Sequence, residues 1–166
     1  MRYPSPDFER KICPPDALAN ALLTLPRPCV FTNGCFDILH RGHVSYLAQA
    51  RSLGASLIVA LNTDASVRRL GKGDDRPINP LENRAAVIAA LGDVDLVTWF
   101  DDDTPAALIE LIQPQILVKG GDWAPAAIVG SAETLARGGQ VHSIPFLFDT
   151  STTATLAKIR QAERAE

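Results

Sequence analysis

The sequence is poor in cysteine and has no long apolar run. Its three cysteines, Cys13, Cys29 and Cys35, are too few and too unevenly spaced for a disulfide framework or for the CxxC pairs of a structural zinc site. The longest apolar runs, Leu57 to Leu61 and Ala85 to Leu91, fall far short of the ~20 residues that a membrane-spanning helix needs. We therefore expect reduced thiols and no membrane segment.

An excess of positive charge is also missing. Sixteen Lys and Arg stand against nineteen Asp and Glu, for a formal net charge of −3, so neither nucleic acid nor an anionic membrane is an expected partner. The first residues lack the apolar core of a signal peptide, which predicts a cytoplasmic protein. A chain of 166 residues fits one domain.

What the sequence does contain is a regular alternation of strand-like and helix-like segments. This alternation predicts an α/β fold: a doubly wound, Rossmann-like sheet of five parallel strands with helices on both faces. Residues 1–28 are expected to form an irregular arm and a helix, and residues 29–166 a single globular domain. The expected strands are Cys29 to Thr32, Leu57 to Leu61, Leu96 to Trp99, Ile116 to Val118 and Gln140 to Ile144; the expected helices include Val44 to Leu53, Leu81 to Leu91, Pro105 to Ile112 (capped by Thr104) and Ala126 to Ala136.

The loop after the first strand contains two histidines around a glycine. If a helix begins near Arg41, His40 and His43 point to the same side, and Gly42 leaves bare backbone against which a nucleoside can lie. The N–H groups at such a helix start also favour an anion. The alternatives are one histidine that caps the helix beside an exposed one and, ranked lowest, metal ligation with His142. For Cys35, packing is favoured over a role as nucleophile.

Two later loops add residues that suit a nucleotide. Gly120 and Gly121 allow close approach of the backbone to a ligand, Asp122 can accept a hydrogen bond from a base or ribose, and Trp123 offers a stacking face or a core side chain. The hydroxyls at 151–153, Ser151, Thr152 and Thr153, can cap the last helix, bind phosphate, or do both.

The string FTNGCFDILHRGH resembles the HxGH signature of the cytidylyltransferase-like nucleotidyltransferase superfamily. The resemblance implies that His40 and His43 contact the nucleotide phosphates and stabilise the transition state. It also implies that the surrounding loop wraps the nucleotide. The loop residues concerned are Thr32, Asn33, Gly34, Phe36 and Gly42. Class I aminoacyl-tRNA synthetases share this element, but the chain is too short for one and has no KMSKS-like string.

Together with VKGGDW and with STT followed by KIR, this string resembles the adenylyltransferases that make ADP-heptose from D-glycero-β-D-manno-heptose 1-phosphate for the lipopolysaccharide core. The resemblance implies ATP and a sugar 1-phosphate as substrates, Mg²⁺ bound mainly through ATP with no metal site of the protein's own, and a homo-oligomer. Rival readings are a cytidylyltransferase acting on a small polyol phosphate such as glycerol 3-phosphate, and a non-catalytic nucleotide-binding module. A dinucleotide dehydrogenase is disfavoured because no GxGxxG follows the first strand.

Two cations complete the prediction through the same resemblance. Lys72, in the polar loop at 71–80, matches a lysine that closes over the α-phosphate, and Arg84 matches an arginine that reaches the nucleotide. Without the resemblance, a solvated lysine and an exposed arginine are the simpler interpretations. Arg76 is a weaker candidate on the same loop, and the acidic run at 101–103 is interpreted as structural because it precedes a helix start.

Overall fold

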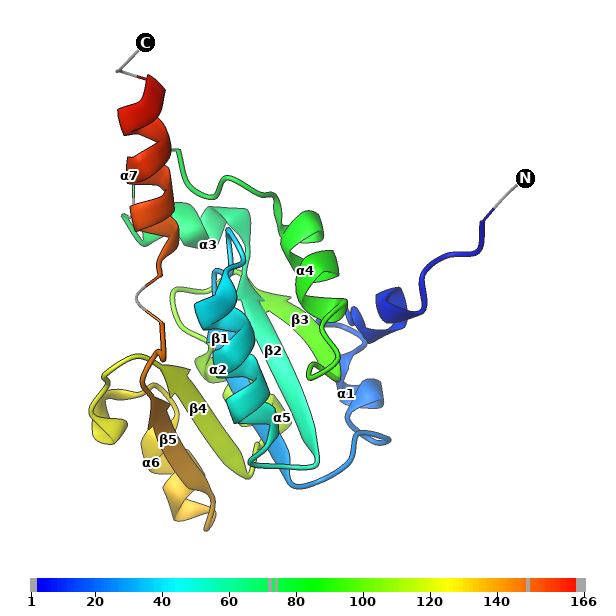
Figure 1. Ribbon diagram of the computed structural model, residues 1–166. Coiled ribbons are helices and arrows are strands. Elements are labelled where there is room, and N and C mark those ends of the chain that lie inside the picture. The colour runs from blue at the N-terminus through cyan, green and yellow to red at the C-terminus, as the bar shows by residue number, and fades with distance from the viewer. Residues whose placement is uncertain (1–2, 72, 74, 149, 164–166) are drawn as a thin grey trace.

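A computed structural model describes residues 3–71, 73, 75–148 and 150–163. Five strands form one parallel sheet, as the sequence predicts, and the structure gives their order as β3-β2-β1-β4-β5 (Figure 1). The strands are β1 (Cys29–Gly34), β2 (Ser56–Asn62), β3 (Leu96–Phe100), β4 (Ile116–Gly120) and β5 (Gln140–Ile144). The chain builds outward from β1 to β3 and then crosses back to place β4 on the other side of β1. The strand order therefore reverses between β1 and β4, and parallel sheets bind ligands at the carboxyl ends of strands at such a point.

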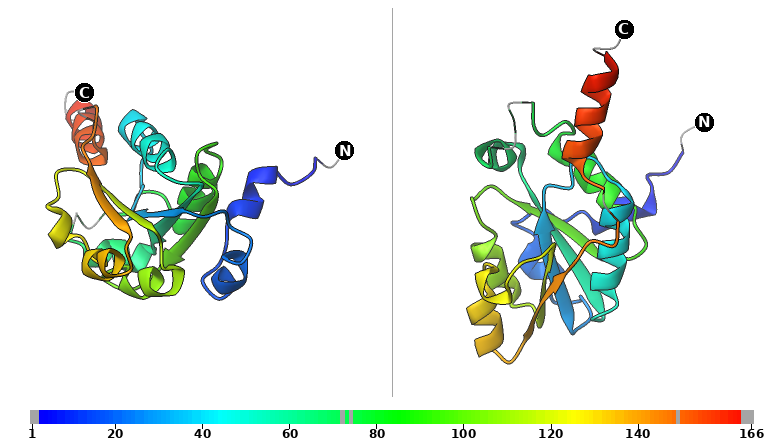
Figure 2. Two further views of the ribbon diagram at one scale, coloured as in Figure 1. Left: turned by 90° about the horizontal axis from the view of Figure 1, so that it is seen from below. Right: turned by 60° about the vertical axis from the view of Figure 1, so that its left-hand side comes forward.

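Helices cover both faces of the sheet (Figure 2). One face carries α2 (Arg41–Arg51) and α4 (Leu81–Ala89), and the other carries α1 (Leu18–Ala21), α5 (Ala106–Ile112) and α6 (Ser131–Ala136). Two short helices, η1 (Asp7–Lys11) and η2 (Pro125–Ala127), lie in connections, and α3 (Asp64–Arg69) follows β2. The last helix, α7 (Thr152–Glu163), projects from the body of the domain near the carboxyl ends of the strands (Figure 1).

The strand β2 shows how the sequence specifies two cores. All seven of its residues are buried, and their side chains alternate between the faces. Leu57, Val59 and Leu61 belong to the core under α2 and α4, whereas Ile58 and Ala60 belong to the core that includes α1 and α5. A strand buried on both faces reads as a continuous apolar run, which explains why this element could be predicted.

Two strands run further than expected, into the glycines of the motifs. β1 pairs with β2 as far as Gly34 opposite Leu61, and β4 pairs with β5 as far as Gly120 opposite Ile144. Pairing between backbones does not require a side chain, so apolar periodicity underestimates the length of these strands. The motif loops therefore start directly from the sheet, which restricts the conformations of their first residues.

Several helix boundaries predicted from sequence are wrong. The helix expected from Pro105 with Thr104 as its cap begins at Ala106, and Pro105 itself occupies the N-cap position. The helix expected over 126–136 is interrupted at Gly130, whose φ is +82°. A Cβ there would lie 2.7 Å from a side-chain carbon of Ile109, so the break allows a close approach to α5.

The N-terminal arm is more ordered than its prolines suggest. Residues Asp7–Lys11 form η1, and Ile12 bridges to Val97 in parallel fashion at the edge of the sheet. The helix expected within residues 1–28 is reduced to the four residues of α1, which bury Leu18. Among the described residues, no helix combines the length and the apolar character needed to cross a membrane.

Candidate functional site

Three adjoining cavities open at the carboxyl ends of β1 and β4. The Lys119 cavity, of about 390 Å³, extends from Asn33 and Lys119 to Thr104. The histidine cavity, of about 530 Å³, includes His40, His43 and Ser151. Between them lies the bridging cavity, of about 260 Å³. It shares Asn33, Gly34, Cys35, Lys119 and Trp123 with the first cavity and Cys35, Phe36, His43 and Phe146 with the second, so the three form one trough.

The two histidines stand together at the start of α2. His40 occupies the N-cap position in an extended conformation, and α2 begins at Arg41, as expected. The imidazole rings of His40 and His43 are stacked, with 3.7 Å between centroids and 20° between planes, and the ring of Phe36 lies 5.1 Å from that of His43. The side chain of His40 makes no capping hydrogen bond, so the alternative of a histidine that merely caps the helix is wrong.

Both imidazoles are neutral at physiological pH. Burial lowers the pKa of His43 to about 4, with a further lowering from His40 and an opposing effect of the Ile38 carbonyl. Burial also lowers the pKa of His40. A neutral imidazole can donate a single N–H to a phosphate oxygen and can take up a proton when negative charge arrives beside it. The pair can therefore donate hydrogen bonds to an anionic ligand and can take up a proton when that ligand binds.

Hydroxyl groups from the far end of the chain close the histidine cavity. The hydroxyl of Thr150 lies 3.1 Å from Nδ1 of His40, and Thr152 donates to the carbonyl of Ile38 at 3.4 Å. Ser151, Thr152 and Thr153 line the cavity at the N-terminus of α7. Ser151 also accepts a hydrogen bond from the N–H of Ala154, which caps α7, so the capping interpretation of this residue is confirmed.

Asp37 fastens the segment that follows the 71–75 stretch to the histidine loop. Its carboxylate accepts hydrogen bonds from the N–H groups of Ile78 and Asn79 at 3.0 and 2.9 Å, and from Nε of Arg76 at 2.5 Å. Burial acts to raise the pKa of Asp37, but these hydrogen bonds outweigh it and hold the pKa below its ordinary value. The carboxylate is thus ionised and fully engaged.

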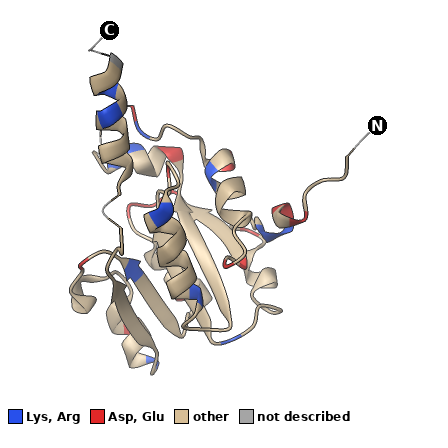
Figure 3. Cartoon of the chain, viewed as in Figure 1, with Lys and Arg blue, Asp and Glu red and all other residues tan. Residues whose placement is uncertain are grey.

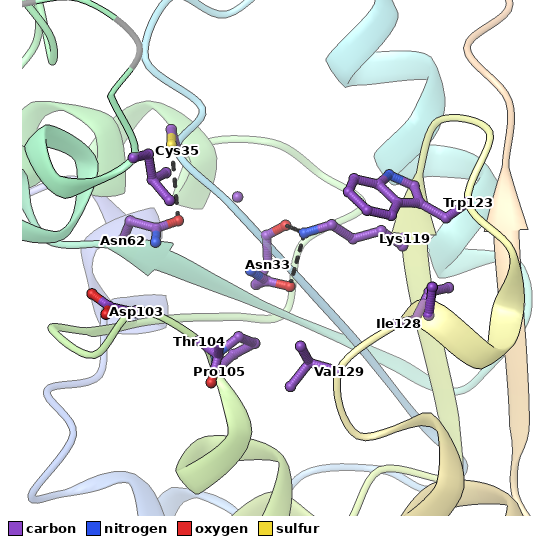
Figure 4. Close-up of a pocket in the computed structure, with 13 residues that line it drawn as sticks. Asn33, Cys35, Asn62, Asp103, Thr104, Pro105, Lys119, Trp123, Ile128 and Val129 are labelled. Atoms are coloured by element: carbon purple, nitrogen blue, oxygen red, sulfur yellow. Dashed lines mark hydrogen bonds between the residues drawn. The ribbon is translucent and has the colours of Figure 1, made fainter.

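Lys119 marks the other end of the trough (Figure 4). It is the single Lys, Arg, Asp or Glu in the five strands (Figure 3). Its Nζ donates to Oδ1 of Asn33 at 3.2 Å and to the Asn33 carbonyl at 3.4 Å. The indole of Trp123 lies nearby and donates to the carbonyl of Gly120. Trp123 is 49% exposed, so it is not a core side chain.

Most of the predicted site residues line this trough, and some do not. Thr32 is fully buried and shares a hydrogen bond of 2.5 Å with the hydroxyl of Tyr46, beneath the cleft. Arg84 is also buried, with its guanidinium occupied by the carbonyls of Cys35, Asn62 and Asn79 and by Asp64. The structure therefore does not bring these two side chains to the cavity surface. The predicted residues that line the trough are Asn33, Gly34, Phe36, His40, His43, Gly120, Trp123, Ser151, Thr152 and Thr153.

Three further predicted residues have different placements. Gly42 is buried, and a Cβ there would lie 3.0 Å from the Thr150 hydroxyl and 3.1 Å from Nδ1 of His40. Asp122 is exposed and lines none of the three cavities. Lys72 lies outside the described residues, so its expected closure over a phosphate stays a prediction.

The sequence analysis did not assign several of the lining residues to the site. Cys35 borders all three cavities, with its thiol 3.9 Å from Oδ1 of Asn62 rather than against a histidine. Lys119 could have been found, because it stands at the end of a strand directly before the paired glycines. Arg76 was a weak candidate, since nothing in the sequence shows that it meets Asp37, 39 positions away.

The acidic run at 101–103 forms a hydrogen bond and ion pairs with neighbouring side chains. Asp101 accepts a hydrogen bond from Thr63, and Arg69 forms ion pairs with Asp101 and with Asp103. Within the part of the chain that the structure describes, no group of three His, Cys, Asp or Glu side chains could hold a metal ion.

Comparison with known proteins identifies sequence relatives. A sequence profile of the family described as Cytidylyltransferase-like matches residues 31–151. The D-beta-D-heptose 1-phosphate adenylyltransferase of Bordetella bronchiseptica is 56% identical over 156 residues, which cover 93% of this chain and 96% of that protein. The bifunctional protein HldE of Hahella chejuensis is 58% identical over 132 residues, but the match covers 80% of this chain and 28% of that protein. The chain thus spans little more than a quarter of the bifunctional relative.

Solved structures share the fold. A lipopolysaccharide core biosynthesis protein from Thermoplasma volcanium superposes with a TM-score of 0.59 at 28% identity, over 71% of this chain and 94% of that chain. Pantothenate synthetase from Thermus thermophilus superposes with a TM-score of 0.56 at 20% identity, over 80% of this chain and 61% of that chain. The second likeness concerns the fold alone.

Proposed function

The chain belongs to the cytidylyltransferase-like family of nucleotidyltransferases, and we propose that it transfers AMP from ATP to D-glycero-β-D-manno-heptose 1-phosphate, giving ADP-heptose and pyrophosphate for the lipopolysaccharide core. The observation that carries this proposal is the high identity to the Bordetella adenylyltransferase over nearly the whole of both chains. The stacked histidines at the switch point of the sheet supply a site that suits the reaction.

The reaction needs no covalent intermediate with the protein. An oxygen of the sugar 1-phosphate attacks the α-phosphorus of ATP, the new P–O bond forms, and the bond between the α-phosphorus and the oxygen bridging to the β-phosphate breaks. Pyrophosphate leaves with the electron pair of that bond. Since the nucleophile is already an anion, the tasks of the protein are positioning and stabilisation of charge.

The histidine cavity is the proposed site of the triphosphate. His40 and His43 face it together with the three hydroxyl residues at the start of α7. Imidazole N–H, hydroxyl and backbone N–H groups can all donate hydrogen bonds to phosphate oxygens. Charge that develops on the α-phosphate in the transition state would strengthen these hydrogen bonds, which is how such donors accelerate a reaction.

Magnesium enters this proposal as part of the substrate MgATP. The described residues supply no cluster of metal ligands, and Asp37, the acid of the histidine cavity, is committed to Arg76 and to two backbone N–H groups. We therefore assign the ion to the phosphates of ATP, where it would shield their charge.

The Lys119 cavity is the proposed site of the acceptor. It joins the histidine cavity through the bridging cavity, so an acceptor bound here has a path to a nucleotide in the histidine cavity. The ammonium of Lys119 offers a cation for the sugar phosphate, and the amide of Asn33 fixes its position. Trp123 and Phe146 border the bridging cavity and supply aromatic rings to its wall.

A pyrophosphate-release assay tests the proposal. The protein is incubated with ATP or CTP and with either heptose 1-phosphate or glycerol 3-phosphate, in the presence of magnesium. We expect release with ATP and heptose 1-phosphate together, and formation of ADP-heptose by mass spectrometry. Release with CTP and glycerol phosphate instead would show the rival cytidylyltransferase, and nucleotide binding without release in any combination would show a binding module.

A further inference from the structure

Arg76 combines deep burial with an incompletely used guanidinium. Its side chain is 6% exposed, and it borders the histidine cavity with His40, His43 and Ser151. Among the described residues, the one hydrogen-bond partner of its side chain is Asp37, which accepts from Nε at 2.5 Å. The terminal nitrogens Nη1 and Nη2 have no partner in that part of the chain, although a guanidinium carries five N–H donors.

The unused nitrogens are not fully enclosed. Buried side-chain nitrogens and oxygens without a partner occur at five other residues of the described chain, and those of Arg76 are not among them. The small exposed fraction of Arg76 therefore includes its terminal nitrogens, and the hollow that this residue borders is the histidine cavity. A guanidinium edge of this kind matches two phosphate oxygens, because its N–H groups form a planar fork.

Asp37 fixes the direction of this fork. The carboxylate is held by two backbone N–H groups in addition to Arg76, and the side-chain amide of Asn79 donates to the Asp37 carbonyl at 2.6 Å. An arginine anchored on one edge loses little further freedom when its other edge binds a ligand. Asp37 thus orients the Arg76 guanidinium for a ligand, in addition to balancing its charge.

The charges around the histidine cavity also favour Arg76 as a binding residue for phosphate. The two histidines are neutral, because burial lowers the pKa of each. Arg41, which follows His40 in the sequence, stacks its guanidinium on the ring of Phe148, and Arg160 forms an ion pair with Asp75. Arg76 is therefore the described cation that borders the histidine cavity. A polyphosphate with several negative charges would meet it directly.

We propose that Arg76 is a phosphate-binding residue, which holds Asp37 through Nε and binds two oxygens of the ATP polyphosphate through Nη1 and Nη2. The assignment rests on the proposed function for the identity of the nucleotide, but the binding step requires a polyphosphate only. It gives the histidine cavity a fixed cation in addition to its neutral donors.

The test compares ligands with and without phosphate. Calorimetry measures the Kd of inorganic pyrophosphate, of ATP and of adenosine for the wild-type chain and for Arg76→Gln. We expect the Kd of pyrophosphate and of ATP to rise about 10- to 100-fold, the range of charge-assisted hydrogen bonds, with the Kd of adenosine within about twofold. Unchanged pyrophosphate binding overturns the proposal, and so does an equal loss for adenosine, which would show a merely structural role.

Arg51→Gln is the matched control. Arg51 also pairs its Nε with an aspartate, Asp95, at 2.8 Å, but at the opposite end of the sheet, where β2 begins. The control removes the same charge and the same kind of ion pair, so we expect the wild-type Kd for pyrophosphate. If Arg51→Gln weakens pyrophosphate binding as much as Arg76→Gln does, the effect comes from the net charge of the chain, and the proposal is overturned.

Two arms keep the result decisive if Arg76→Gln does not fold. Arg76→Lys retains a cation beside Asp37 but lacks the fork, so weaker pyrophosphate binding is expected, and wild-type binding overturns the proposal. In the unmodified protein carrying ¹⁵N-labelled arginine, pyrophosphate should shift the Nη resonances of Arg76, and unchanged resonances overturn the proposal. Neither arm uses turnover, so an absence of ADP-heptose formation would count against the proposed function alone.

Discussion

The imidazole of His40 lies face to face with that of His43, with 3.7 Å between their ring centroids. Two imidazolium rings at this separation would repel each other, so the pair cannot carry two protons without a neighbouring anion. The arrangement couples protonation of the site to phosphate binding. It also means that substitution of either ring changes the environment of the other.

Replacement of His43 by alanine should abolish most of the turnover without unfolding the chain. The ring faces the histidine cavity, and loss of one positioned donor to a developing charge typically costs about 10²- to 10³-fold in rate. The measurement is pyrophosphate release with ATP and heptose 1-phosphate, with circular dichroism as the check on folding. His142→Ala is the control, because that imidazole lies on β5 against Gln140. Near-normal release by His43→Ala would exclude a catalytic role.

Acid should destabilise the chain well above the pH at which carboxylates are protonated. The pKa of His43 is about 4 in the folded chain against 6.5 ordinarily, so between these values the unfolded chain binds the extra proton. The free energy of unfolding should therefore fall as the pH is lowered from 6.5 to 4. The contribution of Asp37, whose pKa is lowered from 3.8, is lost only at still lower pH.

Urea titrations at pH 7, 5.5 and 4.5 measure this dependence. His43→Gln should flatten it, leaving the smaller part that comes from His40. An equally steep loss of stability in wild type and variant would show that His43 is not the group responsible.

Gly42→Ala should separate stability from activity. A Cβ at this position meets the Thr150 hydroxyl at 3.0 Å and Nδ1 of His40 at 3.1 Å, so the imidazole must shift by a few tenths of an ångström. Alanine is otherwise the better helix residue by about 1 kcal/mol, which offsets the strain in the folded state. We expect turnover to fall about tenfold, as misplaced catalytic groups do, with little change in Tm.

Gly92→Ala serves as the comparison, because a Cβ there meets nothing within 4 Å. Both variants are assayed for Tm and for kcat under saturating ATP. A Gly42→Ala protein with wild-type kcat would show that His40 tolerates the displacement.

The fold was predictable because the strands are short segments, mostly apolar, that alternate with helical segments. Helix ends were less predictable where tertiary contacts decide them, as at Gly130, whose close approach to Ile109 breaks a segment that has helical periodicity. The strands' extension into Gly34 and Gly120 was also missed, since glycine carries no periodic signal.

The site was predictable to the extent that its residues are adjacent in sequence. His40 and His43 are three positions apart, and their helix places them together. The contact between Arg76 and Asp37 spans 39 positions and depends on how the loop folds back, which no local pattern encodes. Burial of the Arg84 guanidinium under the loops likewise depends on tertiary contacts between residues that are distant in the sequence.

Lys119→Met should weaken binding of the acceptor more than binding of ATP. The ammonium lies in the Lys119 cavity beside Asn33, whereas the histidines and Arg76 border the other cavity. Loss of a charged hydrogen bond predicts a rise in the KM for heptose 1-phosphate of about 10- to 100-fold, with the KM for ATP within about threefold. Lys119→Arg, which keeps the charge, should recover part of the affinity. A larger change in the KM for ATP would place the nucleotide in this cavity.

Arg84→Ala should destabilise the chain rather than remove a ligand contact. The guanidinium is fully buried and donates to the carbonyls of Cys35 at 2.7 Å, Asn62 at 2.9 Å and Asn79 at 3.0 Å, and to Asp64 at 2.6 Å. These four groups belong to the histidine loop, the end of β2, the segment before α4 and the start of α3. Removal of the arginine leaves them without a donor, which predicts a loss of about 3 to 5 kcal/mol in the free energy of unfolding.

Chemical denaturation measures that loss, and Arg68→Ala, an exposed change on α3, provides the control. Arg84→Lys tests the geometry, because an ammonium retains the charge but cannot reach four acceptors in different directions, so an intermediate loss is expected. The sequence resemblance predicts instead that Arg84 reaches the nucleotide. That alternative requires Arg84→Ala to keep wild-type stability while its affinity for ATP falls, and this result would mean that the guanidinium leaves its carbonyls when nucleotide binds.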